Sequence, residues 1–298
     1  KHSNPKKHQS VIVIVVLVTT LLDAMSIGLI IPVTPDLIMS VAPELNFADA
    51  ATLSGLLISL FALMQLFFGP FFGTLSDQVG RRRIFLFLLV TIIVYHQIFA
   101  LGQSLWLLFL GRLIGGVGAA TNPISAAILA DVSAPKERAV KFGYLGAAFG
   151  LGFVIGPVVG GFLGEFGTRA PFWVAAFLAG INFILGWLYL PETLSRKNRH
   201  DFKWQRANPL GAIYTVSVFP NLRFILVVFL LYQFSTAVYP AIWSFYTLEQ
   251  FSWSTGMIGA SLTLYGISLV CVQGGLVKPI ISKLGEPGAV KLGFIFAV

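Results

Sequence analysis

Charged residues and cysteine are scarce in this sequence. Charged side chains make up 11% of the 298 residues, whereas a soluble domain carries about 25%. The single cysteine, Cys271, excludes an internal disulfide framework. The sequence also lacks a His-Glu-x-x-His motif, a nucleophile elbow and a phosphate-binding glycine loop. Nothing in it therefore supports a membrane-embedded enzyme or a metal site.

Long apolar runs dominate the sequence instead. Hydrophobic residues make up 56% of the chain, and a run of about 20 apolar residues is long enough to cross a bilayer as a helix. We expect eight complete spans and the beginning of a ninth near residue 289. The eight lie near 11–33, 51–75, 84–102, 105–130, 142–164, 171–190, 222–246 and 255–280. The predicted fold class is all-α, a polytopic helical bundle in the lipid bilayer.

The basic residues alternate between loops in a way that predicts the orientation. If the N-terminus is cytoplasmic, 18 of the 20 Lys and Arg residues fall in cytoplasmic loops or at the span ends beside them. The opposite loops carry acids, namely Asp36, Glu44, Asp49, Glu165 and Glu249. This asymmetry follows the positive-inside rule. It accounts for the net charge of +8 without a nucleic-acid partner.

A basic polar stretch at 191–210, after the sixth span, is typical of a linker between two helical bundles. We expect an N-terminal six-span bundle at 1–190, a cytoplasmic linker at 191–221 and a partial C-terminal bundle at 222–298. The chain starts at Lys1 and stops at Val298 inside an apolar run. We therefore expect that part of the natural protein is missing.

The first span contains one carboxylate, Asp23, within VLVTTLLDAMSIGLIIP at 16–32. An ionised Asp at the centre of a bilayer costs at least about 2.5–3.5 kcal/mol, so such residues face water or a partner. A carboxyl group in a cavity can also take up and release a proton. Asp23 is therefore the first candidate for proton coupling. The alternative is a structural Asp that caps a broken helix or pairs with a polar neighbour.

Arg112 is the second charge within the spans. Arginine does not deprotonate in proteins, so its side chain must face a cavity, a carboxylate or backbone carbonyls. It either influences the protonation of Asp23 or forms an ion pair that only orients helices. Weaker candidates for substrate or proton contact are Gln65, Asn122 and His96. Each of these could equally be a polar contact between helices or a structural histidine.

A short charged loop joins the second and third spans, GTLSDQVGRRR at 73–83. Its hinge glycines and opposite charges suit a cytoplasmic gate that makes and breaks contacts. The next cytoplasmic loop adds an acid and a base that can join the same network. The predicted gate residues are Gly73, Asp77, Gly80, Arg81, Arg82, Asp131 and Arg138.

The fifth span carries a stripe of glycines, GLGFVIGPVVGGFLG at 150–164. Glycines every four residues let a neighbouring backbone come close. Plain helix packing is the alternative for any one of them. The predicted set is Gly143, Gly152, Gly156, Pro157, Gly160 and Gly161.

Four of these motifs together resemble the signatures of the Major Facilitator Superfamily, and within it the twelve-span drug:proton antiporters. They are the loop with Gly73, Asp77, Gly80, Arg81 and Arg82, the stretch LFLGRLIGGVGAA, the fifth-span glycines and LLDAMSIGLIIPVTP. Stretches such as FALMQ, GTLSD and GFVIGPVVGG also resemble the tetracycline efflux branch. That branch carries an acid in the third span, where this sequence has Tyr95-His96.

The resemblance implies a major facilitator fold and export of a drug-like or amphipathic small molecule against inward proton flow. Tetracycline is one candidate substrate. Asp23 and Gln65 would lie near substrate and proton, Arg112 would couple them, and the loop at 73–83 would form the gate. The implied location is a bacterial inner membrane, with no cofactor except a divalent cation that the substrate brings. A proton-coupled nutrient symporter of the same fold and a non-functional fragment are the alternatives.

Overall fold

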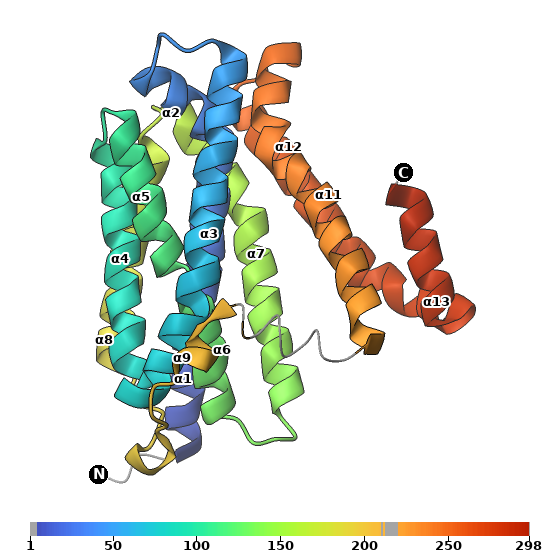
Figure 1. Ribbon diagram of the computed structural model, residues 1–298. Helices are drawn as coiled ribbons and strands as arrows, with labels where there is room; N and C mark the ends of the chain where they lie inside the picture. Colours follow the sequence, from blue (N-terminus) through green and yellow to red (C-terminus); the bar gives the residue numbers. More distant parts are fainter. Residues whose placement is uncertain (1–4, 210, 212–219, 298) are drawn as a thin grey trace.

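The computed structural model describes residues 5–209, 211 and 220–297. These residues form helices and connecting turns, with no strand among them, so the predicted all-α class is confirmed (Figure 1). The first six spans comprise α1 (Pro5–Ile30), η1 (Ile31–Val33), α2 (Thr34–Val41), α3 (Phe47–Val79), α4 (Arg81–Leu101), α5 (Leu105–Gly118), α6 (Thr121–Asp131), α7 (Arg138–Glu165) and α8 (Ala170–Tyr189). The remaining elements are η2 (Arg196–Asn198), α9 (Trp204–Ala207), α11 (Pro220–Phe251), α12 (Thr255–Cys271), η3 (Val272–Leu276) and α13 (Val277–Ala297).

Within the described residues, seven helical segments are long and apolar enough to cross a membrane. They correspond to the first seven predicted spans, and their surfaces carry many exposed apolar side chains. The eighth predicted span differs from its expected bounds. The 17-residue helix α12 ends at Cys271, and a π-helical turn, η3, leads into α13. Part of the predicted linker, residues 210 and 212–219, lies outside the described residues.

Two prolines interrupt the first span. Pro32 and Pro35 lack the N–H that an α-helix needs, and the chain passes through the 3₁₀ turn η1 between α1 and α2. The N–H of Thr34 therefore bonds to the carbonyl of Ile31. The hydroxyl of Thr34 donates to the carbonyl of Ile30 at 2.8 Å, and Ser244 of α11 donates to Ile31 at 2.9 Å. Side chains thus satisfy the backbone groups that the break leaves open.

The fourth predicted span is also two helices, α5 and α6, separated at Ala119–Ala120. Pro123 has no N–H to donate to the carbonyl of Ala119, four residues earlier. The N–H of Asn122 donates to that carbonyl instead, at 3.4 Å. The break therefore lies one turn before the proline.

Two apolar cores occupy the two ends of the first six spans. One contains Val16 of α1 and Phe85 of α4, and the other contains Ile30, Phe99 and further residues of α2 and α5. Between them, the same helices place buried polar side chains at mid-height. These are Thr19, Thr20, Asp23, Ser26, His96, Arg112, Thr121, Ser125 and Asn182. The fold therefore holds a polar layer between two apolar ones.

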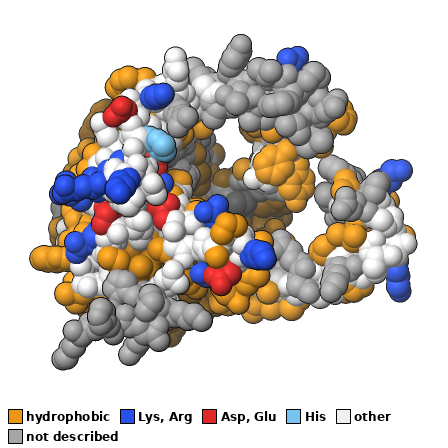
Figure 2. Space-filling model, turned by 90° about the horizontal axis from the view of Figure 1, so that it is seen from below, with side chains coloured by type: hydrophobic (Ala, Val, Ile, Leu, Met, Phe, Trp, Pro, Cys, Tyr) orange, Lys and Arg blue, Asp and Glu red, His pale blue; other side chains and the backbone are white. Residues whose placement is uncertain are grey.

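The helix α7 packs between α1 on one side and α12 on the other. Figure 1 shows α11 and α12 close to α3 and α7 at the end that carries α2, and spreading away towards the end that carries the N-terminus. We call the latter the basic end, defined by residues 76–83, 131–141 and 191–203. We refer to the helices of the first six spans as one group and to α11, α12 and α13 as the other. Figure 2 views the basic end, where Lys and Arg side chains gather beside a hollow between the two groups.

Candidate functional site

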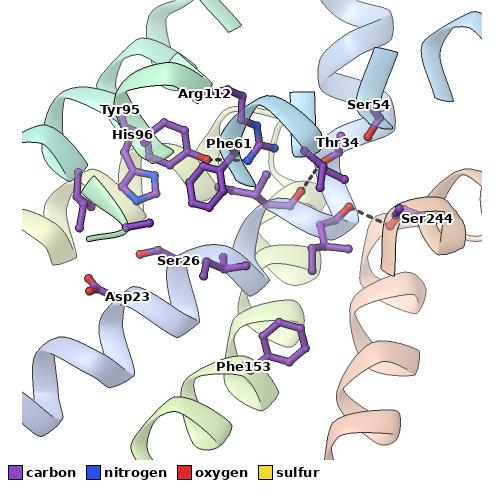
Figure 3. A pocket seen from close by; sticks show the side chains of 18 of the residues that line it. Asp23, Ser26, Thr34, Ser54, Phe61, Tyr95, His96, Arg112, Phe153 and Ser244 are labelled. Atoms are coloured by element: carbon purple, nitrogen blue, oxygen red, sulfur yellow. Dashed lines mark hydrogen bonds between the residues drawn. The ribbon is translucent and has the colours of Figure 1, made fainter. Parts of the chain in front are cut away.

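A cavity of about 310 Å³ lies at the level of the polar layer. Its walls come from α1, α3, α4, α5, α6, α7 and α11, so both groups of helices contribute (Figure 3). The polar side chains that line it are Asp23, Ser26, Thr34, Ser54, Tyr95, His96, Arg112, Thr121, Asn122 and Ser244. The rest of the lining is apolar, so polar contacts are available at only a few points.

Asp23 is 9% exposed and lines this cavity from α1. The hydroxyl of Thr121, at the start of α6, donates to Asp23 Oδ2 at 2.6 Å. One turn earlier on α1, Thr19 donates to Asn182 Oδ1 of α8 at 2.8 Å. The carboxyl group is thus buried, is hydrogen-bonded to α6 and lies on the wall of the cavity. Its hydrogen bond with Thr121, the first residue of α6 after the break at Ala119–Ala120, is the pairing with a polar neighbour that the structural alternative expected.

Arg112 lines the same cavity from α5 and is also 9% exposed. Its Nη1 donates to the hydroxyl of Tyr95 at 3.2 Å. The guanidinium carbon lies 5.2 Å from the ring centroid of Phe99 and 5.9 Å from that of Phe61. Among the described residues no carboxylate lies within ion-pair distance of it. The helix-orienting ion pair, the other alternative, is therefore not formed with Asp23 in this conformation.

His96 and Asn122 line the cavity as well. The His96 side chain is fully buried, and neither ring nitrogen has a hydrogen-bond partner among the described residues. Its ring lies beside that of Tyr95, with the centroids 4.6 Å apart. Figure 3 shows Tyr95 and His96 together on one side of the cavity and Ser244 on the opposite side.

Gln65 lies elsewhere. Its side chain is exposed and lines a second, more open hollow of about 490 Å³. That hollow also contains Gly73 and Asp77 near the basic end, and it shares Ala119 with the central cavity. The geometry therefore groups Gln65 with the predicted gate rather than with Asp23.

Arg81 is the centre of an ionic cluster at the basic end. It lies 2.5 Å from Asp77 and 3.3 Å from Asp131, and its Nη1 donates to Ser76 at 2.6 Å. Its backbone N–H donates to Glu192 Oε1 at 2.9 Å. Glu192 comes from the predicted linker and was not among the predicted residues. Its only signal in the sequence is its position directly after the sixth span.

The other predicted gate residues have different surroundings. Gly80 has a φ of +117°, which favours glycine, and a Cβ there would collide with Glu192. Arg82 donates to the carbonyl of Trp187 at 2.6 Å. Arg138 is exposed at the start of α7 and has no ion-pair partner among the described residues. Nothing lies within 4 Å of a Cβ built on Gly73, so no close helix approach occurs there.

The fifth-span glycines face two different neighbours. A Cβ on Gly152, Gly156 or Gly160 would collide with backbone atoms of α1. A Cβ on Gly161 would lie 3.1 Å from the Cα of Gly259 in α12. Pro157 is buried inside the continuous helix α7, and Gly143 has open space around it. The stripe therefore joins α7 to the first span, and Gly161 joins it to the other group of helices.

Sequence reasoning missed several residues of the site. Tyr95, Thr121 and Phe61 contact the two charges, and Ser244 satisfies the broken first span from the other group of helices. Thr121 could have been found from its place beside the Asn122-Pro123 break. Tyr95 lies at the place where the tetracycline efflux branch carries an acid, and that was its only signal, whereas Phe61 looks like an ordinary apolar residue of a span.

A mid-height cavity with a few polar side chains, lined by two groups of spans, is the arrangement of the binding site in membrane transporters. The chain belongs to the Major Facilitator Superfamily, whose family model matches residues 16–298. It is an integral membrane protein, and the resemblance noted in the sequence is confirmed.

The chain is similar to the class B tetracycline resistance protein of Escherichia coli, with 36% identity over 94% of this chain and 69% of that protein. It is 31% identical to multidrug resistance protein 2 of Bacillus subtilis, over 96% of this chain and 71% of that protein. Among solved structures, it resembles the human organic anion transporter MFSD10 (TETRAN) with a TM-score of 0.70. That match has 24% identity over 91% of this chain and 73% of the transporter, so it shows the fold alone.

Proposed function

We propose that this chain is a proton-coupled exporter of drug-like or amphipathic small molecules that works by alternating access. The observation that carries the proposal is the placement of Asp23. It is the one acid among the described residues that line the central cavity, and it shares that cavity with residues of α11 from the other group of helices. The similarity to a tetracycline resistance protein and to a multidrug resistance protein supports a drug-like substrate.

In this mechanism the side chains of the cavity exchange a proton for substrate. Thr121 orients the carboxyl group of Asp23 from the side of α6, and Arg112 supplies a fixed positive charge on the wall of the same cavity. Uptake of a proton by Asp23 from the outer side releases substrate, and loss of the proton to the cytoplasm resets the cavity. One proton that moves down a potential of 100 mV supplies about 2.3 kcal/mol.

The basic end is proposed to be cytoplasmic because its loops carry most of the Lys and Arg residues. In the described conformation the two groups of helices spread apart at this end, and we propose that the central cavity opens towards it. We assign residues 1–190 to the N-terminal bundle, 191–221 to the linker and 222–298 to a partial C-terminal bundle. The location is the bacterial inner membrane.

The proposed partners are a small molecule, protons and lipid, without nucleic acid. We propose a carrier rather than an enzyme, and no cofactor beyond a divalent cation that a substrate such as tetracycline brings with it.

The test is transport in everted membrane vesicles, with tetracycline as the probe and acridine orange to report proton movement. Asp23→Asn should abolish tetracycline-dependent proton release while the protein still inserts, because the amide cannot bind and release a proton. Asp49→Asn is the matched control, since Asp49 is an exposed acid at the start of α3, away from the cavity. Full coupling in Asp23→Asn would contradict the proposed role.

A nutrient symporter of the same fold is the second candidate, and the Gly156-Pro157 signature of the fifth span counts against it. The direction of flux separates the two. An exporter accumulates the probe in everted vesicles, whereas a symporter accumulates it in right-side-out vesicles.

A further inference from the structure

The charge of Arg112 is unmatched in the cavity. Among the described residues its side chain donates one hydrogen bond, to the neutral hydroxyl of Tyr95, and its Nε has no partner. Asp23 is held by Thr121 and forms no ion pair with it. A buried guanidinium without an anion carries a large desolvation penalty, which a negatively charged ligand would relieve.

His96 is a second unmatched group beside the first. Tyr95 links the two, because its hydroxyl accepts from Arg112 and its ring lies against that of His96. The imidazole is fully buried, lines the cavity and leaves both nitrogens without a partner among the described residues. A neutral imidazole offers one donor and one acceptor, and buried polar groups are almost always satisfied.

The apolar walls of the cavity select the rest of the ligand. Phe61, Phe153 and Phe245 line it together with aliphatic side chains, and Phe61 also lies over the guanidinium. A cavity of about 310 Å³ is at the lower end of the range for small-molecule sites. Flat aromatic rings fill such a space and can stack beside the guanidinium.

From these three observations we infer that the cavity takes an aromatic acid. The ionised oxygen of the ligand pairs with Arg112, a neighbouring polar group bonds to His96, and the ring system lies between the phenylalanines. The inference rests on the proposed function only for the direction of transport.

Binding of three probes with one ring system tests this charge preference directly. The probes are 2-naphthoate, the neutral 2-naphthamide and the cationic 2-naphthylmethylammonium, measured by equilibrium dialysis against the purified chain in lipid nanodiscs. A hydrogen-bonded charge pair is worth about 1.5–3 kcal/mol, so the naphthoate should bind at least about tenfold more tightly than the amide. Equal or tighter binding of the amide or the cation, or no binding of any probe, would overturn the inference.

Variants of Arg112 test whether this side chain binds the carboxylate of the probe. Arg112→Gln should remove the preference for naphthoate over naphthamide, and Arg112→Lys should keep part of it. Arg83→Gln is the control, because it removes an exposed positive charge at the basic end and should leave the preference unchanged. Retention of helicity and of naphthamide binding shows that each variant is folded. An unchanged preference in folded Arg112→Gln would contradict the assignment.

The role of His96 is tested with 3-hydroxy-2-naphthoate, which adds a hydroxyl group beside the carboxylate. His96→Leu should lose the gain in affinity from that hydroxyl, and His96→Gln, which keeps a donor and an acceptor, should recover it. Equal affinities in the two variants would exclude His96 from the contact. If naphthoate is preferred but no probe is exported, the proposed export fails while the acid site stands.

Discussion

The two ends of the molecule differ in what connects the two groups of helices. Towards the α2 end, backbone meets backbone, because Gly161 of α7 lies against Gly256 and Gly259 of α12. At the basic end, the ionic cluster around Arg81 stays within the first six spans and the linker. Close backbone packing therefore holds the two groups together at the α2 end. The ion pairs at the basic end connect residues within one group and the linker.

The largest loss of stability and transport is expected from adding one methyl group between α7 and α12 at the α2 end. In Gly161→Ala, the new Cβ would lie 3.1 Å from the Cα of Gly259 and 3.2 Å from that of Gly256. Overpacking of this kind costs about 1–3 kcal/mol, so the thermal unfolding temperature in nanodiscs should fall and transport should decrease.

Gly143→Ala on the same helix is the matched control. Nothing lies within 4 Å of its added Cβ, and alanine favours a helix over glycine by up to about 1 kcal/mol. The unfolding temperature should therefore stay the same or rise. Equal losses in both variants would show that α7 does not depend on the contact with α12.

A smaller effect is expected from Arg81→Gln at the basic end. Its loss leaves Asp77 and Asp131 near each other without the cation between them, which should lower stability by about 1–3 kcal/mol. Because the cluster lies within one group of helices, the spacing between the groups should hardly change.

Spin labels measure that spacing. Cysteines at Lys136 and Phe224, both exposed, report the distance between the groups at the basic end after Cys271→Ser removes the native thiol. Arg83→Gln serves as the control for loss of one positive charge. A distance that changes in Arg81→Gln alone would show that the cluster does bridge the two groups.

The smallest effect is expected from Glu165→Gln, at the far end of α7. Glu165 accepts a hydrogen bond from the N–H of Gly256 at 2.8 Å, at the start of α12. A carboxylate at a helix N-terminus is favourable, but this one is exposed and is screened by solvent. The unfolding temperature should fall less than in Gly161→Ala, and only at low salt. Glu44→Gln, another exposed acid, should cause no such salt-dependent change.

Much of the fold could be predicted because hydrophobic length and loop charge are local properties. The first seven spans follow from apolar runs of sufficient length. The breaks within the first and fourth spans were not predictable in the same way. They require hydrogen-bond donors for backbone carbonyls that the helix leaves unpaired. In the first span, for example, Ser244 of a distant helix bonds to Ile31.

The candidate site was only partly predictable. An ionised side chain within a span carries a high free-energy cost in lipid, so it is conspicuous in the sequence. Asp23 and Arg112 were found for this reason. Whether they pair with each other depends on the positions of α1 and α5, and the structure leaves them apart. Gln65 illustrates the limit, since its place along α3 turns it towards the second hollow.

The sequence by itself determined that the chain is embedded in a bilayer and how many times its apolar runs can cross it. It also determined which charged side chains need a polar environment within the bilayer. These properties depend on the solvent and on the nearest neighbours along the chain. The tertiary structure alone decided which residues surround each charged side chain and which helix each glycine contacts. It did so because contacts between distant helices depend on shape and rotation, which no local pattern records.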